Sequence, residues 1–234
     1  MITIKVDTKG VERMLNDLQR KQIPFATAVA LTNTGKAVEK RLRLDMGQTF
    51  DRPSPYTMKS TFSTPAKKSD LQATVGLKDK GLRVPPAVLL KEHFSGGTRG
   101  NKPFEKALAG IGALPSGWRA IPGAGLPLDR YGNPKRNTLR EIIGSLKSRS
   151  NIYRGRGKRM QLVGYFMIPV GSRSHLAPGV YIKTGRDIKP VLIFIKSASY
   201  RKVLDLPRIA ADTVDKEFNR EFTKALDHAL ATAK

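Results

Sequence analysis

The sequence predicts an α+β fold: an antiparallel or mixed sheet flanked by N-terminal helices and a long C-terminal helix, with a large insertion rich in Gly, Pro and basic residues. Apolar residues recur at helical spacing near both ends, and short strand-like apolar runs lie between them. We therefore expect a core α+β domain made of residues 1–94 and 160–234. Residues 95–159 are expected to form an inserted arm or interface segment.

The N-terminal part of the chain predicts one strand followed by two helices. Ile2, Ile4 and Val6 alternate with polar residues, which is typical of a short strand. Apolar residues at helical spacing predict an amphipathic helix at residues 8–21, and a longer helix begins at Pro24 and ends before Pro53. The longer helix carries an apolar stripe of Ala28, Leu31, Val38, Leu42 and Met46, and a basic outer face of Lys36, Lys40, Arg41 and Arg43.

The remaining core elements are a short helix, several strands and the terminal helix. Ser54 and Pro55 predict the cap and first turn of a helix that extends to Phe62. The final helix follows Pro207, with Asp205 as its N-cap. Its apolar stripe is Ala210, Val214, Phe218, Phe222, Leu226 and Leu230. Strands are predicted at residues 72–78, 84–90, 161–169, 179–183 and 190–196.

The insertion at residues 95–159 contains two predicted helices separated by a proline-rich loop. One helix spans residues 103–108, and a capping box from Thr138 to Glu141 opens the other. Segments of this length without a sheet of their own usually have a binding role. We expect Phe104, Trp118 and Tyr131 to be buried against a neighbouring molecule, as partner-interface residues.

The charge balance is the strongest indication of function. Lys and Arg total 43 against 19 Asp and Glu, which gives a formal net charge of +24. Such an excess repels itself in a compact chain, so it favours a polyanionic partner, with nucleic acid first. No apolar run is long enough to span a bilayer, and no strongly basic amphipathic helix indicates membrane binding. We expect a soluble chain, made in a cytoplasm, with no membrane partner.

One basic run is the candidate nucleic-acid contact. It lies within residues 147–159, contains no acidic residue and includes glycines that let a backbone approach closely. A solvated loop is the alternative interpretation of such a run. No helix-turn-helix, zinc finger or RNA-recognition signature is present, so binding without sequence preference is expected. The candidate residues are Lys147, Arg149, Arg154, Arg156, Lys158 and Arg159.

Catalytic constellations do not stand out in the sequence. Cysteine is absent, and the three histidines, His93, His175 and His228, are far apart without metal-ligand spacing. The glycine pairs lack the context of a phosphate-binding loop. We expect no enzyme, cofactor or metal site. A weaker reading is a nuclease, for which the acidic candidates are Asp45, Asp51, Asp70 and Glu92.

Several strings resemble a phage protein family. They are His93-Phe-Ser-Gly-Gly-Thr-Arg99, Lys102-Pro-Phe-Glu105, Leu114-Pro-Ser-Gly117, Ile121-Pro-Gly123 and Leu128-Asp-Arg-Tyr-Gly-Asn133. Together they are similar to a signature in minor tail proteins of phages and prophages. Residues 21–43 and 176–230 resemble the tail-completion family called minor tail protein Z, whose shorter members lack the central insertion.

The resemblance implies a function as well as a fold. It implies an α+β virion protein of a tailed phage, at the neck or tail, that completes the tail or joins head to tail as a homo-oligomeric ring around the DNA channel. The implied partners are portal, adaptor, tail-tube or terminator proteins, and genomic DNA without sequence preference. The alternative is a soluble, sequence-independent nucleic-acid-binding protein of ribosomal or nucleoid type, which the charge favours equally.

Overall fold

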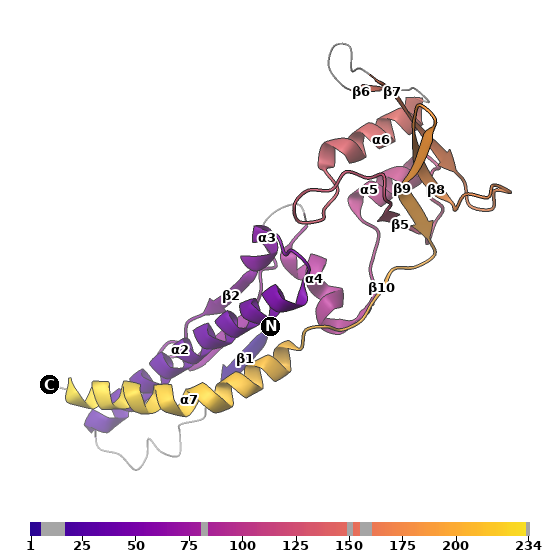
Figure 1. Ribbon diagram of the computed structural model, residues 1–234. Helices are drawn as coiled ribbons and strands as arrows, with labels where there is room; N and C mark the ends of the chain where they lie inside the picture. The colour runs from indigo at the N-terminus through magenta and orange to yellow at the C-terminus, as the bar shows by residue number, and fades with distance from the viewer. Residues whose placement is uncertain (6–16, 81–83, 149–151, 155–160, 233–234) are drawn as a thin grey trace. The chain divides into compact units, whose positions relative to one another are not determined.

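The computed structural model confirms the α+β class and divides the chain into two compact units (Figure 1). It describes residues 1–5, 17–80, 84–148, 152–154 and 161–232. Unit 1 consists of residues 1–96 and 201–234, and unit 2 consists of residues 97–200. The strand pairs that the structure describes are all antiparallel.

Unit 1 is built on helix α2 (Asp17–Thr49), which packs on a three-stranded sheet. The sheet has the order β1-β3-β2, from strands β1 (Ile2–Lys5), β3 (Gln72–Leu77) and β2 (Thr61–Thr64). A Cβ added at Gly35 of α2 would lie only 3.4 Å from the Cβ of Ala73 in β3. Small residues on α2 therefore let the helix backbone lie close to the sheet.

The C-terminal helix α7 (Leu206–Ala231) packs along α2, and Figure 1 shows the two helices side by side. Its start is as predicted, because the Asp205 carboxylate accepts a hydrogen bond from the backbone N–H of Arg208 at 3.3 Å. The predicted stripe is only partly covered. Ala210 is buried with Val38 and Val75, whereas Phe218 and Phe222 are half-buried and stack on each other.

Two predicted helix boundaries in unit 1 are wrong. Helix α2 runs through Pro24 and extends back to Asp17, so the part of the predicted helix 8–21 that the structure describes belongs to α2. A proline removes one helical hydrogen bond, and the burial of Ala26, Thr27 and Ala30 just after it offsets that loss. The remaining residues of that predicted helix lie outside the described residues.

The segment around Pro85 also corrects the sequence prediction. Residues 84–90 were predicted as a strand, but helix α4 (Pro86–Ser95) occupies this segment. Proline at the first helical position has no ladder N–H to lose, and Leu90 and Phe94 then face the same core one turn apart. The apolar run is helical because its spacing matches this core.

The segment after Pro53 forms a helix and a strand. Helix α3 (Pro55–Met58) is capped by the Ser54 hydroxyl, as predicted, but it ends four residues before Phe62. Phe62 lies in β2, whose Thr61 pairs with Leu77 of β3. Threonine favours a strand because its branched Cβ packs well on a pleated surface.

Unit 2 is a five-stranded antiparallel sheet with helices packed on it. The sheet order is β5-β9-β8-β7-β6, and a second ribbon pairs β10 with β4. Helices α5 and α6 contribute Leu108 and Ile142 to a core that they share with Val180, Leu192 and Phe194 of the sheet. The strands are β5 (Arg119–Pro122), β6 (Ile152–Arg154), β7 (Gln161–Ile168), β8 (Gly179–Thr184) and β9 (Asp187–Ile195), with β4 (Gly97–Thr98) and β10 (Ser199–Tyr200); the helices are α5 (Pro103–Gly110) and α6 (Arg136–Ser148).

The predicted domain boundaries need correction at the far end of the insertion. The insertion was predicted at residues 95–159, with residues 160–234 returning to the core domain. The inserted unit instead extends from Gly97 to Tyr200. The reason is sheet pairing: β9 pairs with β5 from within the predicted insertion, so the later strands complete the sheet of unit 2. The insertion is therefore a folded unit with its own core.

Helix α2 provides a direct test of the unit 1 core. Leu42 is fully buried between α4 and the start of α7, whereas Leu44, two residues later, is 54% exposed. Leu42→Ala should lower the free energy of unfolding by about 2–5 kcal/mol, since it removes buried methyl groups and leaves a cavity. Leu44→Ala is the matched control and should change it by less than about 0.5 kcal/mol. Urea unfolding measures both free energies. If the two variants lower the free energy of unfolding equally, Leu42 is not part of the core.

Candidate nucleic-acid interface

The structure describes part of the predicted basic run. Lys147 is exposed in the last turn of α6, and Arg154 ends β6, where its backbone pairs with Gln161 of β7. The others, Arg149, Arg156, Lys158 and Arg159, lie outside the described residues. The run is thus not one loop, because it begins on a helix and continues into a strand.

Helix α6 begins at Arg136, two residues before the predicted capping box. Thr138 is not its cap but is buried in the first turn, and Ile142 and Ser145 are buried farther along. These residues share one face, which packs against the sheet of unit 2. The opposite face carries Arg136 and Arg140, both exposed like Lys147. The amphipathic pattern therefore fixes which basic side chains of α6 face solvent.

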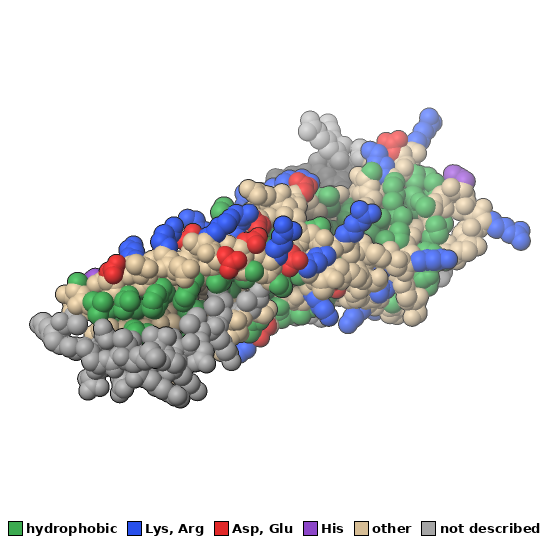
Figure 2. All heavy atoms as spheres, turned by 90° about the horizontal axis from the view of Figure 1, so that it is seen from below, with side chains coloured by type: hydrophobic (Ala, Val, Ile, Leu, Met, Phe, Trp, Pro, Cys, Tyr) green, Lys and Arg blue, Asp and Glu red, His purple; other side chains and the backbone are tan. Residues whose placement is uncertain are grey.

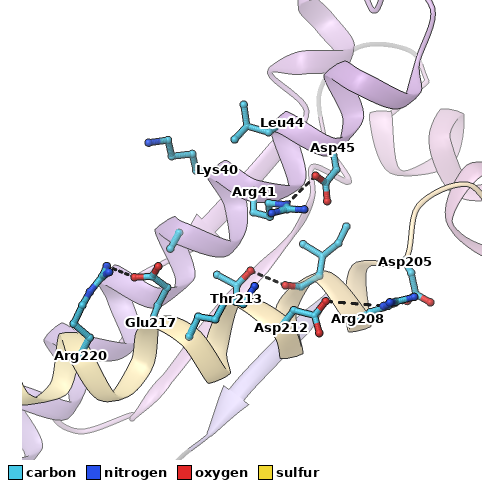
Figure 3. A pocket seen from close by; sticks show the side chains of 13 residues that line it. Lys40, Arg41, Leu44, Asp45, Asp205, Arg208, Asp212, Thr213, Glu217 and Arg220 are labelled. Carbon is cyan, nitrogen blue, oxygen red and sulfur yellow. Dashed lines mark hydrogen bonds and ion pairs between the residues drawn. The ribbon is translucent and has the colours of Figure 1, made fainter.

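Unit 1 contains a second concentration of charge, in a groove of about 590 Å³ between α2 and α7. Figure 2 shows Lys and Arg side chains beside Asp and Glu side chains on one face of the molecule. Within the groove the charges are paired along each helix (Figure 3): Arg41 with Asp45 at 2.9 Å, and Arg208 with Asp212 at 3.9 Å. These pairs partly cancel the positive potential that would attract a phosphate.

The signature strings of the sequence surround a buried ion pair in unit 2. The Arg99 guanidinium donates two hydrogen bonds of 2.7 Å, one to each carboxylate oxygen of Glu105. Glu105 is fully buried and also accepts from the backbone N–H groups of Lys102 at 2.7 Å and Ala120 at 2.8 Å. The pair therefore ties together the segment after β4, the first turn of α5 and strand β5.

The surroundings of this pair keep it ionised. Burial alone would raise the pKa of Glu105, but the hydrogen bonds from Arg99, Ala120 and Lys102 together outweigh burial and hold that pKa below its ordinary value. The Glu105 carboxylate in turn raises the pKa of Arg99. The two groups are bound chiefly to each other, so their arrangement is structural.

Other signature residues shape the loops of unit 2. The Asp129 carboxylate accepts hydrogen bonds from the backbone N–H groups of Tyr131 and Asn133, each at 2.9 Å. These two bonds close the turn at residues 129–133. At Gly123 an added Cβ would lie 2.4 Å from the backbone oxygen of Pro190. Only glycine lets this loop lie against β9. Asp129 and Gly123 therefore shape the loops of unit 2.

The predicted partner-interface residues have different surroundings. Phe104 and Trp118 are partly buried, and both pack against the core of unit 2. This packing accounts for their burial without a neighbouring molecule. Tyr131 is also partly buried, and the Arg130 guanidinium lies 4.7 Å from its ring centroid. A role for these three residues in partner contacts stays a prediction.

Three comparisons were made with known proteins. No family model, curated protein or solved structure matches the chain. The resemblance to minor tail proteins therefore stays a prediction.

The acidic and histidine candidates are spread over separate elements. Asp45 pairs with Arg41 in α2, and Asp51 pairs with the adjacent Arg52. His93 is in α4 in a T-shaped contact with Phe50, at 5.0 Å between ring centroids, and burial lowers its pKa. Within the described ranges, no three His, Asp or Glu side chains are grouped so that they could hold a metal ion. In that same part of the chain, no helix is both long and apolar enough to cross a membrane.

The Arg99–Glu105 pair makes the stability of unit 2 sensitive to acid. A carboxylate with a lowered pKa contributes stability that is fully present above about pH 4.3, its usual value when unfolded, and is lost as the pH falls through the folded-state pKa. Glu105→Gln should cost about 3–5 kcal/mol at pH 7, because Arg99 is left buried without its anion. Its stability should then depend less on pH below about 4.3.

The control for that variant is Asp51→Asn. Asp51 pairs with Arg52 at the surface and is 81% exposed, so its loss should cost less than about 1 kcal/mol. Urea unfolding followed between pH 2 and 7 measures both effects. A Glu105→Gln protein as stable as the parent at pH 7 would show that the buried pair contributes little.

Proposed function

We propose that this chain is a structural virion protein of a tailed phage, a tail-completion or head–tail connector component that forms a homo-oligomeric ring around the DNA channel. The observation that carries the proposal is the net charge of +24 together with the way the charges are arranged. Asp45 on α2 and Asp212 on α7 pair with neighbouring arginines, whereas the outer face of α6 carries exposed basic residues. An uncompensated basic surface suits contact with phosphates that carry no sequence information.

The fold supports the proposal in a second way. The chain enters unit 2 through β4 and leaves through β10, and these two strands pair with each other, Ser199 with Thr98 and Tyr200 with Gly97. The two ends of unit 2 are therefore held together, and the unit has its own core. A ring protomer needs separate surfaces for its ring neighbours, for DNA and for the portal, adaptor, tail-tube or terminator proteins above and below it. Two folded units offer such surfaces.

The experiment that tests the location is a search for the protein in purified tailed particles of the source organism. We expect mass spectrometry to find it in intact particles, and antibody labelling to place it at the neck or tail. Deletion of its gene should leave heads and tails that do not join. Protein that is abundant in the cell but absent from particles would overturn the proposal and favour a nucleic-acid-binding protein of ribosomal or nucleoid type.

The DNA contact is tested separately on purified protein. We expect it to bind random-sequence and defined duplexes equally, and to lose affinity steeply as salt rises, because each phosphate contact releases a counterion. Fluorescence anisotropy with labelled duplexes at 50–200 mM salt, about the range over which such binding weakens strongly, measures both properties. Preference for one duplex over random competitor, or an affinity unchanged by salt, would contradict sequence-independent phosphate binding.

A further inference from the structure

Helix α6 carries a row of unpaired basic residues on its outer face. At 3.6 residues a turn, Arg136, Arg140 and Lys147 lie within about 40° of one another around the helix axis. All three are exposed, and within the described residues no ion pair involves any of them. Their backbones span about 16 Å, which corresponds to about five base-pair steps of duplex DNA. Charge and spacing both suit a polyanion.

A glycine in the middle of the same helix is the second observation. Gly144 lies next to the basic row, one turn after Arg140, and a Cβ added there would have no atom within 4 Å. Glycine in a helix interior costs about 1 kcal/mol relative to alanine. In α2, by contrast, Cβ atoms added at Gly35 and Gly47 would each meet a side chain at 3.4 Å. Packing accounts for the glycines of α2 and does not account for Gly144.

Resting on the proposed function, we infer that the outer face of α6 is the surface on which the chain binds the phosphate backbone of duplex DNA. In this interface Arg136, Arg140 and Lys147 contact phosphates. Gly144 has no side chain, so the DNA backbone can approach the helix closely at this point. Arginine donates in a fork that matches phosphate oxygens, and lysine adds a point charge. The groove of unit 1 is less suited, because arginines that line it are paired with Asp45 and Asp212.

Neutralising the row tests the charge contacts. In the full chain, the triple variant Arg136→Gln, Arg140→Gln, Lys147→Gln should bind a random-sequence duplex at least about tenfold more weakly at 0.15 M salt, and the slope of log affinity against log salt should fall by about 2.7. The matched control is Lys183→Gln, Lys189→Gln, Lys196→Gln, which removes the same charge from exposed sites of unit 2. It should retain most of the affinity and slope.

The variant Gly144→Gln distinguishes a binding surface on α6 from a general effect of net charge on DNA affinity. Gly144→Gln leaves the net charge unchanged and places a strong helix former in open space, so it should raise the melting temperature of unit 2 by about 2–4 °C. Its longer side chain should nevertheless weaken duplex binding severalfold. Higher stability with lower affinity is the result that a merely structural glycine would not give.

Three outcomes would overturn the inference. If the parent binds duplex DNA while the α6 triple variant and Gly144→Gln bind as it does, this face is not the site, although the proposed DNA contact stands. If the parent chain itself binds no duplex DNA, the α6 interface and the proposed DNA contact are both wrong. If poly-glutamate binds the α6 face and duplex DNA does not, the row serves an acidic protein partner, which leaves a virion role possible without DNA contact.

Discussion

The buried pair of Arg99 and Glu105 is the interaction on which the inserted unit depends. Its hydrogen bonds join the segment after β4, the first turn of α5 and strand β5, and Arg99 also interacts with Tyr200, where the chain leaves the unit. A carboxylate that is fully buried is tolerated only with good hydrogen-bond geometry. A register of β5 that moved the Ala120 N–H away would remove one of the four hydrogen bonds that this buried carboxylate accepts. The pair thus selects one arrangement of segments that are far apart in the sequence.

This dependence changes what the signature strings mean. Residues of these strings close turns, as Asp129 does, or let two segments approach, as Gly123 does. Residues of this kind specify how unit 2 folds, and a fold does not by itself carry a function. The residues that bear on function are those whose identity folding leaves unexplained. On α6, these are Gly144 and three exposed cations, Arg136, Arg140 and Lys147, for which the described part of the chain shows no ion pair.

Local patterns in the sequence predicted the elements more reliably than their partners. The cap at Asp205 and the strand at residues 72–78 follow from neighbouring residues, and both predictions were confirmed. The end of the insertion was misplaced because no local signal shows that β9 pairs with β5. A strand was wrongly predicted at residues 84–90 because a short apolar run has no distinctive period. The buried Arg99–Glu105 pair was missed because charged residues in sequence usually indicate a surface, although Glu105 at the third position of a helix was a usable signal.

The basic residues of the candidate interface were only partly predictable for the same reason. The run at residues 147–159 was visible as composition, but the α6 face depends on which side of the helix the core covers, and that is set by residues such as Ile142 and Ser145. Once that face is packed, Arg136, Arg140 and Lys147 are held outward on a rigid element. A preorganised row loses less conformational entropy on binding than the same charges on a loop. In the proposed interface the sheet beneath α6 therefore positions the basic row without touching the ligand, and the core of unit 2 lies between the buried ion pair and the exposed basic face.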